Sequence, residues 1–101
     1  MAHELVPKVQ ELVKSNKIII FMKGEPTFPQ CGFSAKAVQV LKTLEQPFAS
    51  VDVLADDALW EALEEFTQWP TVPMIFINGE FVGGCDILSE MHETGELQKL
   101  V

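Results

Sequence analysis

The chain lacks the sequence features of membrane-spanning and nucleic-acid-binding proteins. Its longest apolar run, Ile18 to Met22, is far shorter than the roughly 20 apolar residues of a transmembrane helix. Basic side chains are scarce, because 7 of them stand against 15 acidic ones and give a formal net charge of −8. This charge repels polyphosphates in general. We therefore expect neither a membrane segment nor a nucleic-acid partner.

Cysteine is equally scarce, with only Cys31 and Cys85 in 101 residues. The first residues lack the basic and apolar regions of a secretory signal, so we expect a cytoplasmic protein, or an organelle-matrix protein if a presequence was removed. Thiols stay reduced in these compartments, which favours reactivity or metal ligation over a structural disulfide. The histidines are weak ligand candidates, because His3 is near a terminus and His92 is on an acidic helix. The length predicts a single domain over residues 1–101.

The spacing of apolar residues predicts an alternation of helices and strands. The run Ile18 to Met22 has no polar alternation, which is typical of a strand buried on both faces. Asn78-Gly79 predicts a tight hairpin turn, Asp86 is the expected cap of the fourth helix, and residues 23–30 are expected to form a loop. Helices are predicted near residues 5–16, 31–46, 56–67, 86–94 and 96–100, and strands near residues 18–22, 48–53, 74–77 and 80–82.

This order describes an α/β fold with a βαβ half followed by a ββα half. The first two strands are separated by a helix and are therefore expected to be parallel, whereas the last two form an antiparallel hairpin. The prediction is a four-stranded mixed sheet with helices on both faces. Open α/β sheets bind their ligands at the carboxyl ends of strands, where the segment after Met22 begins.

The segment from Lys23 to Ser34 places Cys31 at the start of the second predicted helix. Unpaired backbone N–H groups and the helix dipole stabilise a thiolate at such a position. Ser34 stands where a second cysteine would complete a Cys-x-x-Cys pair. Cys31 is therefore a candidate nucleophile or metal ligand that needs a second thiol from elsewhere.

Val72-Pro73 lies directly before a predicted strand. The local sequence alone favours a trans bond, because only about 5–6% of X-Pro bonds are cis. Val72 keeps both its N–H and its C=O in an irregular segment. These groups are suited to pair with the extended backbone of a peptide-like ligand.

Together these segments closely resemble the monothiol glutaredoxins of the CGFS type, a branch of the thioredoxin-fold proteins. The resemblance covers nearly the whole chain, and its motifs occur in the order of the family. The matching segments are Phe21-Met22-Lys23-Gly24, Pro29-Gln30-Cys31-Gly32-Phe33-Ser34, Val51-Asp52-Val53, Trp69-Pro70-Thr71-Val72-Pro73 and the stretch from Asn78 to Asp86.

The resemblance implies a thioredoxin/glutaredoxin fold, a cis Pro73 and glutathione bound beside Cys31. It implies that Lys23 faces the glycine carboxylate of glutathione, that Thr71 and Val72 hold its backbone, and that Phe33 and Trp69 wall the site. It further implies that the segment Gly84-Cys85-Asp86 meets the γ-glutamyl end. Trp60 and Ala35 depart from the family pattern, in which many relatives carry basic side chains; Trp60 either packs on its helix or alters the site.

The resemblance also implies a [2Fe–2S] cluster bridged between two protomers, with a monomeric apo form. Such a cluster needs four thiolates. Two arrangements satisfy this count: Cys31 and a glutathione thiol from each protomer, which the resemblance favours, or Cys31 and Cys85 from each. The role of Cys85 stays open between bystander, resolving thiol and ligand.

The leading hypothesis is an iron–sulfur carrier that passes its cluster to acceptor proteins, with weak oxidoreductase activity at most. The alternative is a glutathione-dependent oxidoreductase that removes glutathione from mixed disulfides, with Cys85 as a resolving thiol in one variant. A third hypothesis, which comes from the resemblance alone, is a cluster-bridged heterodimer with a BolA-type protein.

Overall fold

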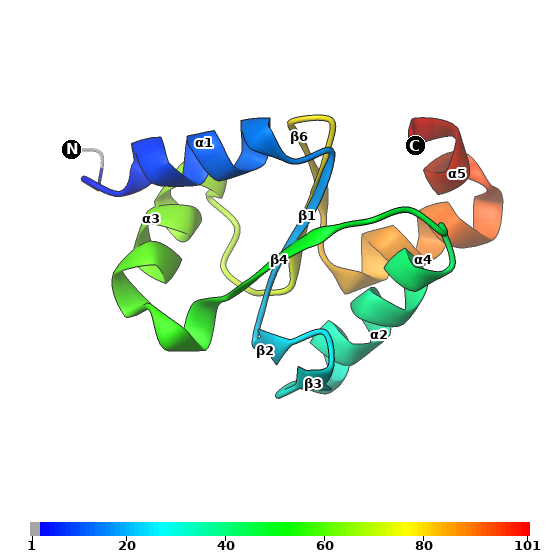
Figure 1. Cartoon of the computed structure of the whole chain (residues 1–101), viewed down its shortest axis with the longest axis horizontal. Coiled ribbons are helices and arrows are strands. Elements are labelled where there is room, and N and C mark those ends of the chain that lie inside the picture. Colours follow the sequence, from blue (N-terminus) through cyan, green and yellow to red (C-terminus); the bar gives the residue numbers. More distant parts are fainter. Residues whose placement is uncertain (1–2) are drawn as a thin grey trace.

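Strand β1, Ile18–Met22, runs through the middle of a four-stranded sheet in the computed structural model, which describes residues 3–101 (Figure 1). The strand order is β4-β1-β5-β6. β1 pairs in parallel with β4, Ala49–Asp52, and antiparallel with β5, Met74–Ile77, which continues into β6, Glu80–Gly83. The predicted mixed sheet and its pairing are confirmed.

Helices cover both faces of this sheet, as Figure 1 shows. One face is covered by α1 and α3, which contact each other, and the other by α2 and α4, with α5 against α4. Within residues 3–101, none of the helices is both long and apolar enough to cross a membrane. The helices are α1, Val6–Ser15; α2, Gly32–Lys42; α3, Asp57–Thr67; α4, Cys85–Thr94; and α5, Glu96–Leu100.

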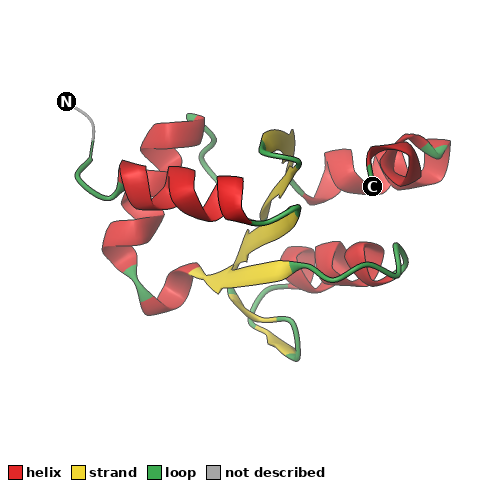
Figure 2. Cartoon of the chain, turned by 45° about the horizontal axis from the view of Figure 1, so that its top comes forward, coloured by secondary structure: helices red, strands yellow, loops and turns green. Residues whose placement is uncertain are grey.

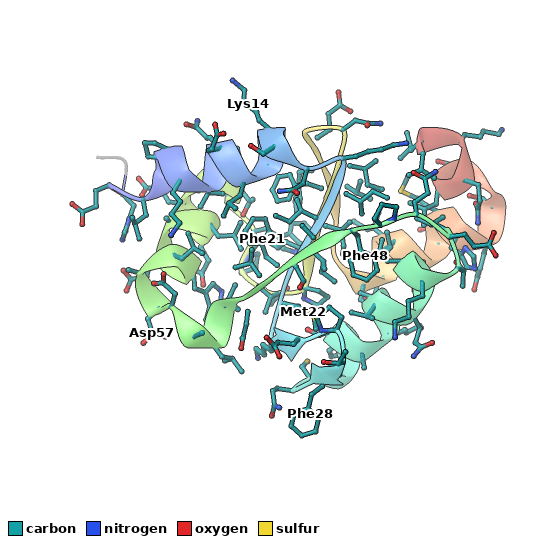
Figure 3. The ribbon with its side chains drawn as sticks, in the orientation of Figure 1. Lys14, Phe21, Met22, Phe28, Phe48 and Asp57 are labelled. Carbon is teal, nitrogen blue, oxygen red and sulfur yellow. The ribbon has the colours of Figure 1, made fainter. Side chains whose placement is uncertain are left out.

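The burial of β1 explains why its sequence is apolar throughout. Successive side chains of a strand point to opposite faces. Ile18, Ile20 and Met22 pack in the core with α2 and α4, while Ile19 and Phe21 pack in the core with α1 and α3. Figure 3 shows Phe21 on the α1 and α3 side of the sheet and Phe48 on the side of α4. β1 therefore anchors two cores, and its carboxyl end leads directly into Lys23.

The cap of α3, the turn between β5 and β6 and the end of α4 have the residues and backbone angles that the sequence predicted. Asp56 caps α3, because its Oδ1 accepts a hydrogen bond from the Leu59 N–H at 3.1 Å. Asn78 and Gly79 have φ values of 54° and 82°, as the predicted hairpin turn requires. Gly95, with φ of 84°, ends α4.

Residues 23–30 do not form the irregular loop that was expected. Gly24–Glu25 (β2) and Phe28–Pro29 (β3) pair as a small antiparallel hairpin. Figure 2 shows its two strands outside the main sheet, next to the start of α2. The hairpin closes through the Gln30 N–H, which donates to the Lys23 carbonyl at 2.9 Å. Pairs this short carry no periodicity, so the sequence pattern did not reveal them.

Three other boundaries were predicted wrongly. The second helix, α2, ends at Lys42 and not near residue 46. The second strand stops at Asp52, because its Oδ1 accepts from the Leu54 N–H at 2.9 Å and turns Val53–Ala55 into a 3₁₀ helix, η1. The N-cap of α4 is Gly84 rather than Asp86. Asp86 instead lies in the first turn, where a carboxylate favourably faces the positive end of the helix dipole.

Candidate functional site

A cavity of about 580 Å³ lies beside Cys31. Its walls come from five parts of the chain: the segment after β1, the start of α2, α3, the irregular segment before β5, and the start of α4. All ten residues singled out from the sequence line it: Lys23, Cys31, Phe33, Trp69, Thr71, Val72, Pro73, Gly84, Cys85 and Asp86. Three more residues complete the lining: Trp60, Pro70 and Ile87.

Cys31 is the N-cap residue of α2 and is partly exposed. The pKa of its thiol is lowered from the ordinary value of 9.0, chiefly by a hydrogen bond from the Ser34 backbone N–H. The Phe33 N–H, the Lys23 charge and the Ser34 hydroxyl lower this pKa further, while partial burial raises it. The thiolate is therefore stabilised at a helix N-terminus, as the position of Cys31 predicted.

Ser34 has a role that sequence reasoning missed. It was interpreted only as the position of an absent thiol, but its side chain is fully buried. Its Oγ accepts a hydrogen bond from the Lys23 backbone N–H at 3.2 Å, and its hydroxyl also acts on Cys31. A hydroxyl can donate one hydrogen bond and accept others. The Ser34 hydroxyl therefore links Lys23, directly after β1, to Cys31 at the start of α2. The sequence did contain a signal for this role. Ser34 is a polar residue at helical spacing from Ala37, Val38 and Leu41, which form the apolar face of α2.

Asp52 fixes the other side of the same segment and was also missed as a supporting residue. Its Oδ1 accepts from the Gly24 N–H at 2.9 Å as well as from the Leu54 N–H. Gly24 has φ of 87°, a backbone conformation that glycine adopts without strain. Two hydrogen bonds thus fix the backbone around Lys23. The Lys23 N–H donates to Ser34 Oγ, and the N–H of the next residue, Gly24, donates to Asp52 Oδ1.

The Val72–Pro73 peptide bond is cis. The resemblance implied this isomer, whereas the local sequence alone favoured trans. Both residues are buried and both line the cavity. Within residues 3–101, no hydrogen bond involves the N–H or the C=O of Val72. These two groups are therefore available to an extended ligand backbone.

The two tryptophans of the cavity are placed by aromatic and cationic contacts. The Nζ of Lys23 lies 5.7 Å from the ring centroid of Trp60, within the range of a cation–π interaction. Trp69 packs edge-on against Phe81, with ring centroids 5.6 Å apart. Trp60 also packs against the core under α1 and α3, so it both packs and lines the site, while Ala35 is not among the lining residues.

The two thiols differ in exposure. Cys85 is buried, with 5% of its surface exposed, whereas Cys31 is partly exposed beside Phe33, which is 63% exposed. In the part of the chain that the structure describes, no cluster of three or more His, Cys, Asp or Glu side chains is arranged to hold a metal ion. A metal centre at Cys31 would therefore need ligands from outside one chain.

Comparisons with known proteins agree with this geometry. The family model described as Glutaredoxin matches residues 18–82. A Synechocystis protein named as an uncharacterized monothiol glutaredoxin ycf64-like is 46% identical over 101 residues, which cover 100% of this chain and 94% of that protein. Glutaredoxin 4 of Escherichia coli K12 is 45% identical over 95% of this chain and 84% of its own length.

Some plant relatives are longer than this chain. It spans 59% of the chloroplastic monothiol glutaredoxin-S7 of rice, at 48% identity over 98% of this chain. Since relatives are named as chloroplastic and mitochondrial as well as bacterial proteins, membership of the family does not assign one compartment.

Two solved structures show the same fold. The solution structure of reduced poplar apo GrxS14 is 48% identical, has a TM-score of 0.83, and covers 98% of this chain and 93% of its own. A crystal structure of a buckwheat glutaredoxin–glutathione complex is 31% identical, with a TM-score of 0.84 over 94% of this chain and 84% of that one. From its sequence, its fold and these relatives, the chain belongs to the glutaredoxin family and, within it, to the monothiol glutaredoxins.

Proposed function

We propose that this protein binds glutathione beside Cys31 and carries a [2Fe–2S] cluster that two protomers share. The observation that carries the proposal is the cavity itself, which joins a stabilised thiolate to groups suited to a short peptide. The buckwheat glutaredoxin that was solved with glutathione has the same fold, which supports glutathione as the ligand.

Glutathione has two charged ends and an extended backbone, and the cavity offers a partner for each. Lys23 supplies a compact cation for the glycine carboxylate. Asp86 is exposed in the first turn of α4 and accepts from the α-ammonium at the γ-glutamyl end. The backbone groups of Val72, next to exposed Thr71, pair with the middle of the ligand.

Shape supports the same placement. Phe33 and Trp69 are aromatic residues of the cavity lining, and Pro73 and Gly84 lie beside each other in it. A Cβ added to Gly84 would come within 3.4 Å of the Pro73 carbonyl oxygen and 3.6 Å of Trp69 Nε1. These are ordinary van der Waals distances, so the Cα of Gly84 lies close to the Pro73 and Trp69 part of the lining.

The cluster is cargo, and its four thiolates are best supplied by two Cys31 side chains and two glutathione molecules. The contrast in burial supports this choice over two Cys31 and two Cys85 residues. Cys31 is exposed enough to face a second protomer, whereas Cys85 is 5% exposed and lies inside the wall of the cavity. We place Cys85 as a contact to glutathione.

Transfer follows from the nature of the ligands. Glutathione is held by non-covalent contacts only, so cysteines of an acceptor protein can replace it at the irons one bond at a time. The holo form is then a homodimer and the apo form a monomer. A BolA-type protein that replaces one protomer would give a heterodimer with the same Cys31 ligand. A reducing compartment, the cytoplasm or an organelle matrix, keeps both thiols available.

The lowered pKa of Cys31 favours a second candidate function, removal of glutathione from mixed disulfides. The Cys31 thiolate would attack the glutathione sulfur, form a Cys31–glutathione disulfide and release the protein thiolate, which takes up a proton. A second glutathione thiolate would then attack the bound glutathione sulfur, releasing glutathione disulfide and the Cys31 thiolate.

In a variant of this route, the Cys85 thiolate takes the place of the second glutathione. It attacks the Cys31 sulfur of the mixed disulfide, a Cys31–Cys85 disulfide forms, and glutathione leaves as a thiolate. A disulfide requires the two Cα atoms to lie within about 7 Å. Because Cys85 is buried, the start of α4 would also have to move. Cys85→Ser tests this variant: unchanged turnover contradicts it, and loss of an intramolecular disulfide after oxidation supports it.

Anaerobic reconstitution tests the leading proposal. The wild type, Cys31→Ser and Cys85→Ser are incubated with iron, sulfide and glutathione, and are then separated by size. We expect the wild type and Cys85→Ser to elute as coloured dimers with two irons per dimer, and Cys31→Ser to elute as a colourless monomer. A colourless wild-type monomer would refute the carrier function, and a colourless Cys85→Ser would show that Cys85 is a ligand.

A further inference from the structure

The part of the cavity around Lys23 has an unusual balance of charge. Among the lining residues in the described range 3–101, Lys23 is the only basic side chain. Its Nζ lies over the face of Trp60. Trp60 also lines a second, smaller hollow of about 280 Å³, and the other residues of that hollow are Asp57, Glu61 and Glu64.

Two of these carboxylates are neighbours of Trp60 on α3. Asp57 and Glu64 are three and four positions from Trp60 along α3, and such residues are neighbours on one face of a helix. A Debye length of about 8 Å at physiological salt leaves their charges only partly screened. A ligand carboxylate that reaches Lys23 thus has this single lining cation as its partner, while Asp57 and Glu64 beside Trp60 on α3 repel it.

Trp60 itself contributes no charge to this contact. Its aromatic face attracts the Lys23 ammonium and holds it over the ring. An exposed or half-exposed lysine gains little from a single carboxylate, because solvent screens the pair. Lys23 is only half-buried. The indole face carries negative charge density and offers no attraction to a carboxylate, so it does not favour the acid over an uncharged amide or ester.

We propose that an uncharged residue at position 60, here Trp60, leaves this end of the site tolerant of thiol peptides whose C-terminal carboxyl group is uncharged. The chemical class is a cysteine-centred thiol tripeptide, such as glutathione, that carries a C-terminal amide or ester. This inference rests on the proposed glutathione site and adds a specificity to it. The uncharged side chain at position 60 determines the specificity, because it leaves Lys23 as the lining cation of this end, and the acidic residues next to Trp60 on α3 reinforce the effect.

Calorimetric titration of the reduced full chain with glutathione and with glutathione C-terminal amide tests the proposal. We expect the two dissociation constants of the wild type to differ by less than about fivefold, the most that one screened lysine contact supplies. In Trp60→Arg, a planar guanidinium can pair with the carboxylate through two hydrogen bonds, and we expect a preference of at least about tenfold for the acid. Trp60→Leu is the matched control and should keep the preference below about fivefold.

The outcomes separate this inference from the proposed function. A preference of fivefold or more for glutathione over its amide in the wild type overturns the inference while leaving the glutathione site intact. An unchanged ratio in a folded Trp60→Arg variant also overturns it. If neither ligand binds the wild type, the glutathione site itself fails, and the inference fails with it. Lys23→Gln, which removes the one lining cation found within residues 3–101, should bring the ratio to about one or below; a retained preference for the acid contradicts the account.

Discussion

Gly24 is the residue on which the geometry of the Cys31 segment depends most sharply. It opens the β2–β3 hairpin with φ of 87°. A Cβ at this position would lie 2.7 Å from the Phe28 carbonyl oxygen and 2.8 Å from the Gln30 backbone N. Both of these atoms belong to the backbone, so a side-chain rotation cannot relieve the contact. Gly79 is a matched control, because it has φ of 82° and a Cβ added there would meet no atom of a non-adjacent residue within 4 Å.

The comparison of Gly24→Ala with Gly79→Ala separates backbone strain from crowding. A positive φ costs an alanine about 1–2 kcal/mol, and both variants have this cost. Crowding against the hairpin backbone adds about 1–3 kcal/mol at Gly24 only. We therefore expect a loss of about 1–2 kcal/mol in the free energy of unfolding for Gly79→Ala, and about 2–5 kcal/mol for Gly24→Ala.

Urea unfolding followed by tryptophan fluorescence measures both losses, and thermal unfolding gives a second readout. For a domain of this size each 1 kcal/mol corresponds to a Tm shift of about 4–8 °C. Gly24→Ala should therefore melt at least about 4 °C below Gly79→Ala. Only Gly24→Ala should weaken glutathione binding, because its hairpin positions Lys23 and Cys31. Equal losses of stability in the two variants, or equal glutathione affinities, would refute this reasoning.

Three further predictions concern the same segment. The lowered pKa of Cys31 predicts that alkylation by iodoacetamide reaches half its maximal rate below pH 9.0 in the folded protein and at a higher pH in urea; the same midpoint in both states would contradict it. The pKa of Cys31 is lower in the folded protein than in the unfolded chain, so the ionised thiol stabilises the folded state. This contribution to the free energy of unfolding grows as pH rises from the folded pKa towards 9.0, and it is lost as pH falls through the folded pKa. Ser34→Ala leaves the Lys23 N–H without its acceptor and should cost about 1–3 kcal/mol in urea unfolding and raise the alkylation midpoint; a variant as stable as the wild type would show that this hydrogen bond contributes nothing. Asp52→Ala removes the shared acceptor of the Gly24 and Leu54 N–H groups and should also cost about 1–3 kcal/mol; a loss below about 0.5 kcal/mol would contradict the role given to Asp52.

The sequence predicted the parts of the fold that depend on burial periodicity. The apolar run of β1 indicated a strand covered on both faces, and its residues divide between the two cores. The predictions failed where one side-chain acceptor or one glycine decides the backbone. Asp52 ends β4 before Val53 by accepting from Leu54, and Gly84 rather than Asp86 caps α4.

The candidate site shows the same division. The thiol at the start of α2 was found from its local physical signature, whereas the cis isomer of Pro73 and the roles of Cys85 and Asp86 came from the family resemblance. The buried hydroxyl of Ser34 and the contact between Lys23 and Trp60 were not found. Both join residues that are far apart in the sequence, and only the packing of α2 and α3 against the end of β1 brings them together.

The glutathione content of the purified holo dimer tests the central claim most directly. The dimer is reconstituted, freed of unbound glutathione by gel filtration, and denatured in acid, and iron and glutathione are then measured in the same sample. Ligation by Cys31 and glutathione predicts two glutathione molecules for every two irons. A dimer with two irons and no glutathione would contradict the account and would assign the remaining two thiolates to Cys85.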